Sequence, residues 1–149
     1  MADPLTVHER VLHTLRTEGE AMLALAEGLN TDESQRLAWA KAVELLIPCQ
    51  GHLVVSGMGK SGLVGAKISA TCSSLGLPSS FLHPSEAVHG DLGRIGPEDV
   101  ALLISNSGGT AEVVDLALHL RTDGVPTIGM SAHDDSPLAE SVSVHLRLA

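Results

Sequence analysis

Aromatic side chains are almost absent from this sequence of 149 residues, which has one tryptophan, one phenylalanine and no tyrosine. Proteins that bind single-stranded nucleic acids stack the bases on aromatic rings, so this shortage argues against such ligands. Positive charge is scarce too, with 9 lysines and arginines against 18 aspartates and glutamates and a formal net charge of −9. That charge repels nucleic acid and anionic membranes, and we expect neither as a partner.

Long apolar runs are also missing. No run approaches the roughly 20 residues that a membrane-spanning helix needs, and the first ten residues lack the basic and apolar regions of a signal peptide. The two cysteines, Cys49 and Cys72, lack metal-ligand spacing, and we interpret them as small buried apolar residues of a reducing compartment. We therefore expect a cytoplasmic protein. Its 44% hydrophobic content predicts an aliphatic core.

The first third of the chain has helical periodicity. Apolar residues recur at helical spacing over residues 6–27, and Gly28 is typical of a helix end. Asn30, followed three residues later by Glu33, predicts the start of a second helix that runs to about residue 47. This N-terminal helix pair has broad apolar faces, which favours self-association.

After Gly51 the pattern changes to strand, turn and helix, repeated. Helices are expected over about residues 60–75 and 109–122, and a short one begins at Ser136-Pro137. A polar loop is expected over residues 83–92. The predicted strands cover about residues 52–56, 78–82, 100–104, 127–130 and 142–146. Apolar strands that alternate with helices predict an α/β fold, a three-layer α/β/α sandwich with a five-stranded parallel sheet. We expect one domain over residues 1–149, with the helix pair in 1–48 and the αβ nucleus in 49–149.

Two turns rich in glycine and hydroxyl side chains each follow an apolar strand directly. The first is Ser56–Gly62, with the sequence Ser-Gly-Met-Gly-Lys-Ser-Gly, and the second is Ser105–Thr110, with Ser-Asn-Ser-Gly-Gly-Thr. Such turns point backbone N–H groups at one spot, where the helix dipole also favours negative charge. Both lie at carboxyl ends of parallel strands, where open α/β sheets bind their ligands. Together they predict a site for a phosphorylated small molecule.

Two nucleotide-binding alternatives fit the first turn poorly. Gly57-x-Gly59-x-x-Gly62 has the form of a dinucleotide fingerprint, but the next strand ends in Phe81-Leu82-His83 without the carboxylate that holds the ribose. Gly59-Lys60-Ser61 resembles the end of a P-loop, but the first glycine that a P-loop requires falls on Val54. A smaller phosphate site remains. For Ser107 and Thr110, a role as simple helix caps stays open.

The motifs taken together resemble those of the sugar isomerase (SIS) domain family. Ser105-x-Ser107-Gly108-x-Thr110-x-Glu112 is similar to the phosphosugar signature of that family. The segments 57–62 and 83–93 resemble its arabinose 5-phosphate isomerase branch, and the likeness spans about residues 38–146. The resemblance implies a flavodoxin-like five-stranded sheet, a homotetramer and active sites shared between subunits. It also implies a role in making the precursor of the Kdo sugar of lipopolysaccharide or capsules.

The reaction implied by the resemblance converts D-ribulose 5-phosphate to D-arabinose 5-phosphate, an aldose–ketose isomerisation through an enediol. Such chemistry needs a general base, donors for the developing oxyanion and a grip on the phosphate. The resemblance implies that Glu112 is the general base, that Lys60 stabilises the enediolate or holds a substrate oxygen, and that His89 assists ring opening or proton transfer. The implied substrate and phosphate contacts are Gly59, Ser61, His83, Ser105, Asn106, Ser107 and Thr110.

Other interpretations of the same residues remain open. Glu112 can serve only the dipole of its helix, and Lys60 can be a solvated residue at a helix start. A third alternative groups His83, Glu86, His89 and Asp91 around a metal ion, but their spacing matches no strong zinc signature. We expect no metal or cofactor, because an enediol mechanism does not require one. The remaining histidines, among them His133 and His145, are interpreted as surface or packing residues.

The sequence departs from the family pattern in two places. Gly109 stands where the isomerases commonly have glutamate, and the sequence ends at Ala149, before a segment that the family uses in its active site and before its CBS modules. We therefore expect an SIS domain only. A sensor that binds a sugar phosphate without converting it is one alternative function, and an isomerase of another sugar phosphate is a second.

Overall fold

The computed structural model describes residues 4–148, and these form two compact units. The units divide between Arg36 and Leu37, within the second helix. Among the described residues, no helix has the length and apolar character that a membrane crossing requires. The elements in chain order are α1 Pro4–Thr31, α2 Glu33–Leu46, β1 Leu53–Gly57, α3 Gly59–Ser74, β2 Ser79–Phe81, α4 Pro84–Val88, the 3₁₀ turn η1 Asp91–Arg94, β3 Val100–Ile104, α5 Ala111–Thr122, β4 Thr127–Ser131, α6 Pro137–Ser141 and β5 Val144–Arg147.

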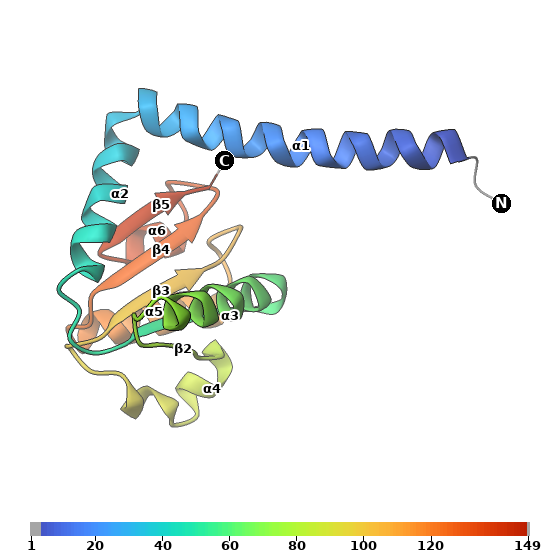
Figure 1. The fold of residues 1–149 in the computed structure, drawn as a ribbon. Helices are drawn as coiled ribbons and strands as arrows, with labels where there is room; N and C mark the ends of the chain where they lie inside the picture. Colours follow the sequence, from blue (N-terminus) through green and yellow to red (C-terminus); the bar gives the residue numbers. More distant parts are fainter. Residues whose placement is uncertain (1–3, 149) are drawn as a thin grey trace. The chain divides into compact units, whose positions relative to one another are not determined.

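The larger unit is built on a five-stranded sheet with the order β2-β1-β3-β4-β5 (Figure 1). All four strand pairings are parallel, as the alternation of apolar strands and helices predicted. The chain moves outward from β1 to β2, then returns past β1 to β3 and continues in the other direction. The order of the strands therefore reverses at the β1–β3 pair, which is the switch point of a doubly wound sheet.

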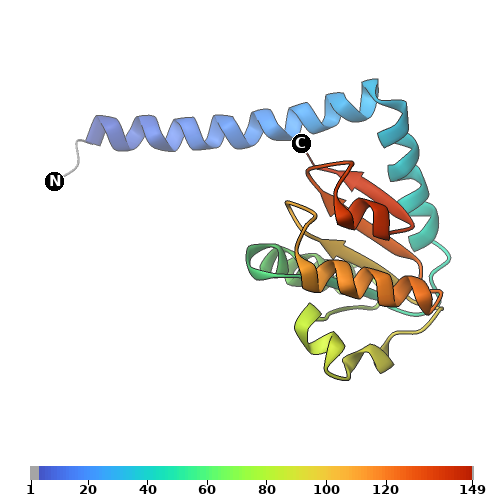
Figure 2. The same ribbon diagram turned by 180° about the vertical axis from the view of Figure 1, so that it is seen from behind.

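Helices cover both faces of this sheet, which confirms the predicted three-layer α/β architecture. The C-terminal part of α2 and helix α3 pack on one face, and α5 and α6 pack on the other, as the two opposite views show (Figures 1 and 2). Alternation along β1 divides its side chains between the two cores, with Val54 facing α5 and Val55 facing α3. Both cores are aliphatic.

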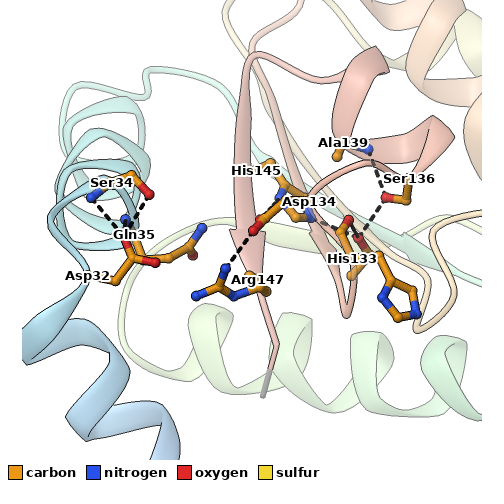
Figure 3. A network of polar contacts seen from close by, with 10 residues as sticks. Asp32, Ser34, Gln35, His133, Asp134, Ser136, Ala139, His145 and Arg147 are labelled. Carbon is orange, nitrogen blue, oxygen red and sulfur yellow. Dashed lines mark hydrogen bonds and ion pairs between the residues drawn. The ribbon is translucent and has the colours of Figure 1, made fainter.

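The N-terminal unit corrects two expectations about where its helices start and end. Helix α1 passes through Gly28 and ends at Thr31, and Asn30 lies inside it. Asp32 begins α2 instead: its Oδ1 accepts hydrogen bonds from the Ser34 backbone N–H at 3.0 Å and the Ser34 hydroxyl at 2.7 Å (Figure 3). A carboxylate that satisfies free amides at a helix start is a strong cap. A single glycine costs a helix only about 1 kcal/mol, so Gly28 does not end α1.

The segment 83–92 is also more regular than expected. It contains α4 and the start of η1 in place of a continuous loop. Pro84 occupies the first turn of α4, where its fixed φ and missing N–H are no disadvantage, and Glu86 adds a favourable charge there. Cys49 and Cys72 are free thiols and only partly buried, which corrects the expectation that they are buried.

Candidate functional site

The two glycine-rich turns start at adjacent positions on the same edge of the sheet. Gly57, the last residue of β1, pairs in register with Ile104, the last residue of β3. From these level strand ends, α3 and α5 leave toward opposite faces of the sheet. The site therefore lies at the switch point, where two helix N-termini approach one another and where doubly wound sheets bind ligands.

Close backbone packing explains the glycines of the first turn. A Cβ on Gly57 would lie 2.9 Å from the Ile104 carbonyl oxygen, and one on Gly62 would lie 2.6 Å from the Gly57 carbonyl oxygen. Gly59 has a φ of +55°, which favours glycine. Ser56 belongs to the strand, since its buried hydroxyl donates to the Leu82 carbonyl at 2.6 Å. The first turn thus owes its shape to missing side chains.

Side chains at the start of α3 leave their polar groups available. Lys60 is exposed and Ser61 is partly exposed, and neither side chain makes a hydrogen bond or an ion pair with any residue in the range 4–148. Met58 occupies the N-cap position but supplies no side-chain bond to the helix amides. The first turn of α3 can therefore accept an anion from solution.

The second turn is held by hydroxyl groups. The Ser105 and Thr110 hydroxyl oxygens lie 2.9 Å apart in a hydrogen bond, and the Gly109 N–H donates to the Ser107 hydroxyl at 3.2 Å. Thr110 is the N-cap residue of α5, yet its side chain makes no capping bond, so the interpretation of Thr110 as a simple helix cap is wrong. Three hydroxyl groups consequently gather within one turn of six residues.

The backbone of the second turn is tied to its neighbours. The Ser105 N–H donates to the Met130 carbonyl at 3.0 Å, and the Asn106 carbonyl accepts from the Ala132 N–H at 2.9 Å. The carbonyl of Gly108, which has a φ of +66°, accepts from the Leu138 N–H at 2.9 Å. These bonds connect the turn to β4 and to the start of α6. The Asn106 side chain is exposed.

The remaining predicted residues surround this edge without bonding to it. Glu112 is exposed in the first turn of α5. His83 and His89 flank α4 at its two ends, the first partly buried and the second exposed. Within the part of the chain that the structure describes, the side chains of Glu112, His83 and His89 make no hydrogen bond or ion pair. The structure therefore gathers the hydroxyl groups and leaves the side chains of Glu112, His83 and His89 unbonded within the described residues.

The metal alternative finds no support in the geometry. Over residues 4–148, no cluster of three or more histidine, cysteine, aspartate or glutamate side chains is arranged to bind a metal ion. Asp91, one of the four candidates, forms an ion pair with Arg94 at 3.5 Å.

Sequence reasoning missed a polar network beside the second turn. His145 was interpreted as a surface or packing residue, but its Nε2 lies 2.8 Å from the buried Ser131 hydroxyl and its Nδ1 lies 3.3 Å from Asp134 Oδ1. Burial lowers the pKa of His145, and the neighbouring Asp134 opposes that shift. The alternation of β5 was the available signal, because it places His145 and Arg147 on one face and Val144 and Leu146 on the other.

Three cavities of the larger unit lie elsewhere. One of about 220 Å³ is lined by His52, Val54, Ser80, Leu82, Arg94 and Ile95. A second, of about 230 Å³, lies near the amino ends of the strands, and a third, of about 150 Å³, lies between α2 and the sheet. None of the three is lined by the Ser105–Thr110 turn. The candidate site is an open edge in a single chain.

Comparison with known proteins assigns this architecture to a family. The SIS domain profile matches residues 46–149. Among curated proteins, the arabinose 5-phosphate isomerase KdsD of Pseudomonas aeruginosa is 45% identical over 133 residues, which are 89% of this chain and 39% of the relative. The arabinose 5-phosphate isomerase KpsF of Escherichia coli is 43% identical over 138 residues, or 93% of this chain and 42% of the relative. The chain spans about two fifths of these curated relatives.

Solved structures agree. A Listeria monocytogenes protein at 32% identity superposes with a TM-score of 0.90 over 100% of this chain and 75% of its own. An Escherichia coli CFT073 protein, solved in complex with arabinose 5-phosphate, has a TM-score of 0.77 at 35% identity over 94% of this chain and 73% of its own. By sequence profile, by identity to its relatives and by fold, this chain belongs to the SIS domain family.

Proposed function

We propose that this chain catalyses the interconversion of D-ribulose 5-phosphate and D-arabinose 5-phosphate through an enediol. The observation that carries this proposal is the meeting of two phosphate-type turns at the level ends of β1 and β3. Identities of 45% and 43% to proteins named arabinose 5-phosphate isomerase supply the choice of substrate, as does the complex of a related protein with arabinose 5-phosphate. The biosynthetic role would be the supply of a precursor for Kdo.

The phosphate of the substrate binds between the two turns in this proposal. Hydroxyl groups of Ser61, Ser105, Ser107 and Thr110 are suited to the oxygens of a phosphate ester, and the amides at the starts of α3 and α5 add donors. The Asn106 amide and the backbone of Gly59, which has a φ of +55°, complete this end of the site. A net charge of −9 repels the substrate at long range, so these local donors must provide the attraction.

The reacting end of the sugar lies toward the exposed side chains around this edge. Glu112 takes the proton from the carbon beside the carbonyl and returns it to the former carbonyl carbon, while the hydroxyl proton moves to the former carbonyl oxygen. The Lys60 ammonium stabilises the negative oxygen of the enediolate between these two steps. His89, at the C-terminal end of α4, assists ring opening. His83, at its N-terminal end, holds sugar hydroxyl groups. No metal or cofactor enters any of these steps.

We further propose a homotetramer in the cytoplasm. Helix α1 exposes apolar side chains along much of its length, including Leu15 at 61%, Met22 at 73% and Leu23 at 71%. Exposed apolar surface of this extent favours burial against other subunits, and closed symmetry is the usual result. Two free cysteines suit a reducing compartment. Sedimentation equilibrium tests the assembly, and a stable monomer would contradict it.

An assay of the purified protein with both pentose phosphates tests the reaction. Glu112→Gln is expected to lower kcat by about 100-fold to 10,000-fold while substrate binding persists, because only the base is removed. Asp115→Asn is the matched control, since this carboxylate is exposed one turn further along α5. Binding of the sugar phosphates without turnover in the unmodified protein would instead identify a sensor. Turnover restricted to another sugar phosphate would replace the substrate.

A further inference from the structure

Three residues near the end of the sheet are connected in the order of a hydrolase triad. The Ser131 hydroxyl lies 2.8 Å from His145 Nε2, and His145 Nδ1 lies 3.3 Å from Asp134 Oδ1. Arg147 Nη1 donates to the other oxygen of Asp134 at 2.6 Å, and Figure 3 shows the Asp134–Arg147 bond beside the imidazole. Serine, histidine and aspartate in this order activate a nucleophile in acyl-transfer enzymes.

Burial excludes a nucleophilic role for this serine. Ser131 is 0% exposed, so no acyl group can reach its oxygen. The same hydroxyl also lies 3.2 Å from the His133 carbonyl and 2.9 Å from the Ser136 hydroxyl. The Ser131 oxygen is therefore enclosed by three polar partners. Its role is to hold neighbouring groups in place.

What it holds is the second glycine-rich turn. Ser136 is the N-cap of α6, and its hydroxyl accepts from the Ala139 N–H at 3.3 Å (Figure 3). The preceding amide in that helix, of Leu138, donates to the Gly108 carbonyl at 2.9 Å. Gly108 packs so closely on Ser136 that a Cβ would overlap the Ser136 side chain, and it would lie 3.1 Å from Ser131 Cβ. Hydrogen bonds therefore run from β5 through β4 to the start of α6, and that helix start contacts the middle of the turn through the Leu138 amide and through the packing of Ser136 on Gly108.

We propose that His145, Ser131 and Ser136 are positioning residues that fix the Ser105–Thr110 turn in its phosphate-binding shape. This inference rests on the proposed function, because it assigns that turn to the phosphate. The three residues act through Gly108 and do not touch the substrate. We name this set the Ser131 array.

The hydroxyl protons of the Ser131 array can be arranged so that its hydrogen bonds follow one donor-to-acceptor order. When the neutral His145 ring carries its proton on Nδ1, facing Asp134, its Nε2 at 2.8 Å can accept the Ser131 proton in place of the His133 carbonyl, which lies farther away at 3.2 Å. Ser131 then accepts the proton of Ser136, and Ser136 accepts the Ala139 N–H. Every group in this order has one donor and one acceptor matched. Loss of the Ser131 hydroxyl interrupts the order at its centre: His145 Nε2 loses this partner, and the Ser136 hydroxyl loses its acceptor while still accepting the Ala139 N–H.

Titration with inorganic phosphate, followed by calorimetry, tests the Ser131 array in the full chain. Ser131→Ala is expected to weaken phosphate binding and to raise KM for the pentose phosphate by about threefold to tenfold, the range of one hydrogen bond. Its kcat should stay within about twofold, because the reacting side chains lie on other elements. Ser141→Ala is the matched control. Ser141 lies in α6 and is buried like Ser131, but its hydroxyl donates only to the Pro137 carbonyl, at 2.7 Å.

His145 supplies a second pair of variants should Ser131→Ala fail to fold. His145→Gln retains an amide that reaches Ser131 and is expected to keep most of the phosphate affinity, whereas His145→Leu should lose it to the same extent as Ser131→Ala. A merely structural role would lower the free energy of unfolding in Ser131→Ala and Ser141→Ala alike and leave phosphate affinity unchanged in both. That result overturns the inference, as does the absence of phosphate binding to the unmodified protein. Phosphate binding without isomerisation overturns the proposed function alone.

Discussion

The two glycine-rich turns lie at the same edge of the sheet, but different interactions hold them there. The turn after β1 is shaped by glycines whose missing side chains let β1, β3 and α3 approach closely, and its Lys60 and Ser61 side chains bond to no residue in the range 4–148. The turn after β3 is shaped by hydrogen bonds to β4 and α6 and by its own hydroxyl pair. We therefore expect function and stability to be separable in the first turn. In the second turn we expect the same hydroxyl groups to serve both.

Substitution of Lys60 is expected to have the largest effect on activity. It tests most directly whether activity and stability are separable in the first turn. Lys60→Met is expected to reduce kcat/KM by about 100-fold or more, because it removes the charge that faces the enediolate. The free energy of unfolding in urea should change by less than about 0.5 kcal/mol, since the side chain is exposed and bonds to none of the residues that the structure describes. Lys67→Met, on the exposed part of the same helix, is the control. A kcat/KM within twofold of the unmodified protein would remove Lys60 from the mechanism.

Gly62 tests the packing of the first turn. Gly62→Ala places a Cβ 2.6 Å from the Gly57 carbonyl oxygen, and relief of this overlap requires α3 to move away from the sheet. We expect a loss of about 1–3 kcal/mol in the free energy of unfolding, measured with urea. Gly93→Ala should cost much less, because a Cβ at Gly93 meets nothing within 4 Å. Equal effects of the two substitutions would mean that close packing does not shape this turn.

Thr110 tests whether stability and binding are joined in the second turn. Thr110→Val keeps the shape of the side chain but leaves the Ser105 hydroxyl, which is 2% exposed, without its partner at 2.9 Å. We expect a loss of about 1–3 kcal/mol in unfolding free energy together with weaker phosphate binding. Thr122→Val, at the exposed end of α5, should affect neither property strongly. A change in only one of the two properties at Thr110 would break the contrast drawn above.

His145 gives the smallest effect, on the dependence of stability on pH. Burial lowers its pKa in the folded state, so below the ordinary value of about 6.5 the unfolded chain takes up this proton more readily than the folded chain. Stability conferred by the neutral ring is complete above that pH and decreases as the pH falls. Urea unfolding of the unmodified protein should therefore lose more free energy between pH 7.5 and 5.5 than that of His145→Gln. An identical loss would show that His145 does not contribute.

Local signals predicted most of the larger unit from the sequence. The limits of β3 at Val100–Ile104 agree with the prediction, and the Ser136-Pro137 pair begins α6 as expected, with the serine hydroxyl capping the helix. These features depend on residues within a few positions of one another. The start of α2 was misplaced because Asn30 and Asp32 are both good caps, and only the path of the chain decides between them.

In the candidate site, too, local features were predictable from the sequence and long-range contacts were not. The turns at Ser56 and Ser105 were recognisable because strand, glycine and hydroxyl residues follow each other directly in the sequence. The Ser131 array was not, since Ser131 and His145 are 14 residues apart and meet only through the β4–β5 register, in which Ser131 pairs with Arg147. Hydrophobic periodicity identifies a strand but does not fix which residue of its neighbour lies opposite.

The shared end point of β1 and β3 sets a strict tolerance on chain length. Gly57 and Ile104 are register partners, so the two glycine-rich turns leave the sheet at the same height, where we propose that the phosphate binds. Each strand residue adds about 3.3 Å, which is comparable with the width of a phosphoryl group. Inserting or deleting a single residue within either strand would therefore shift one glycine-rich turn along the strand direction relative to the other. Half of the proposed phosphate donors would then be out of reach, even with every site side chain still present.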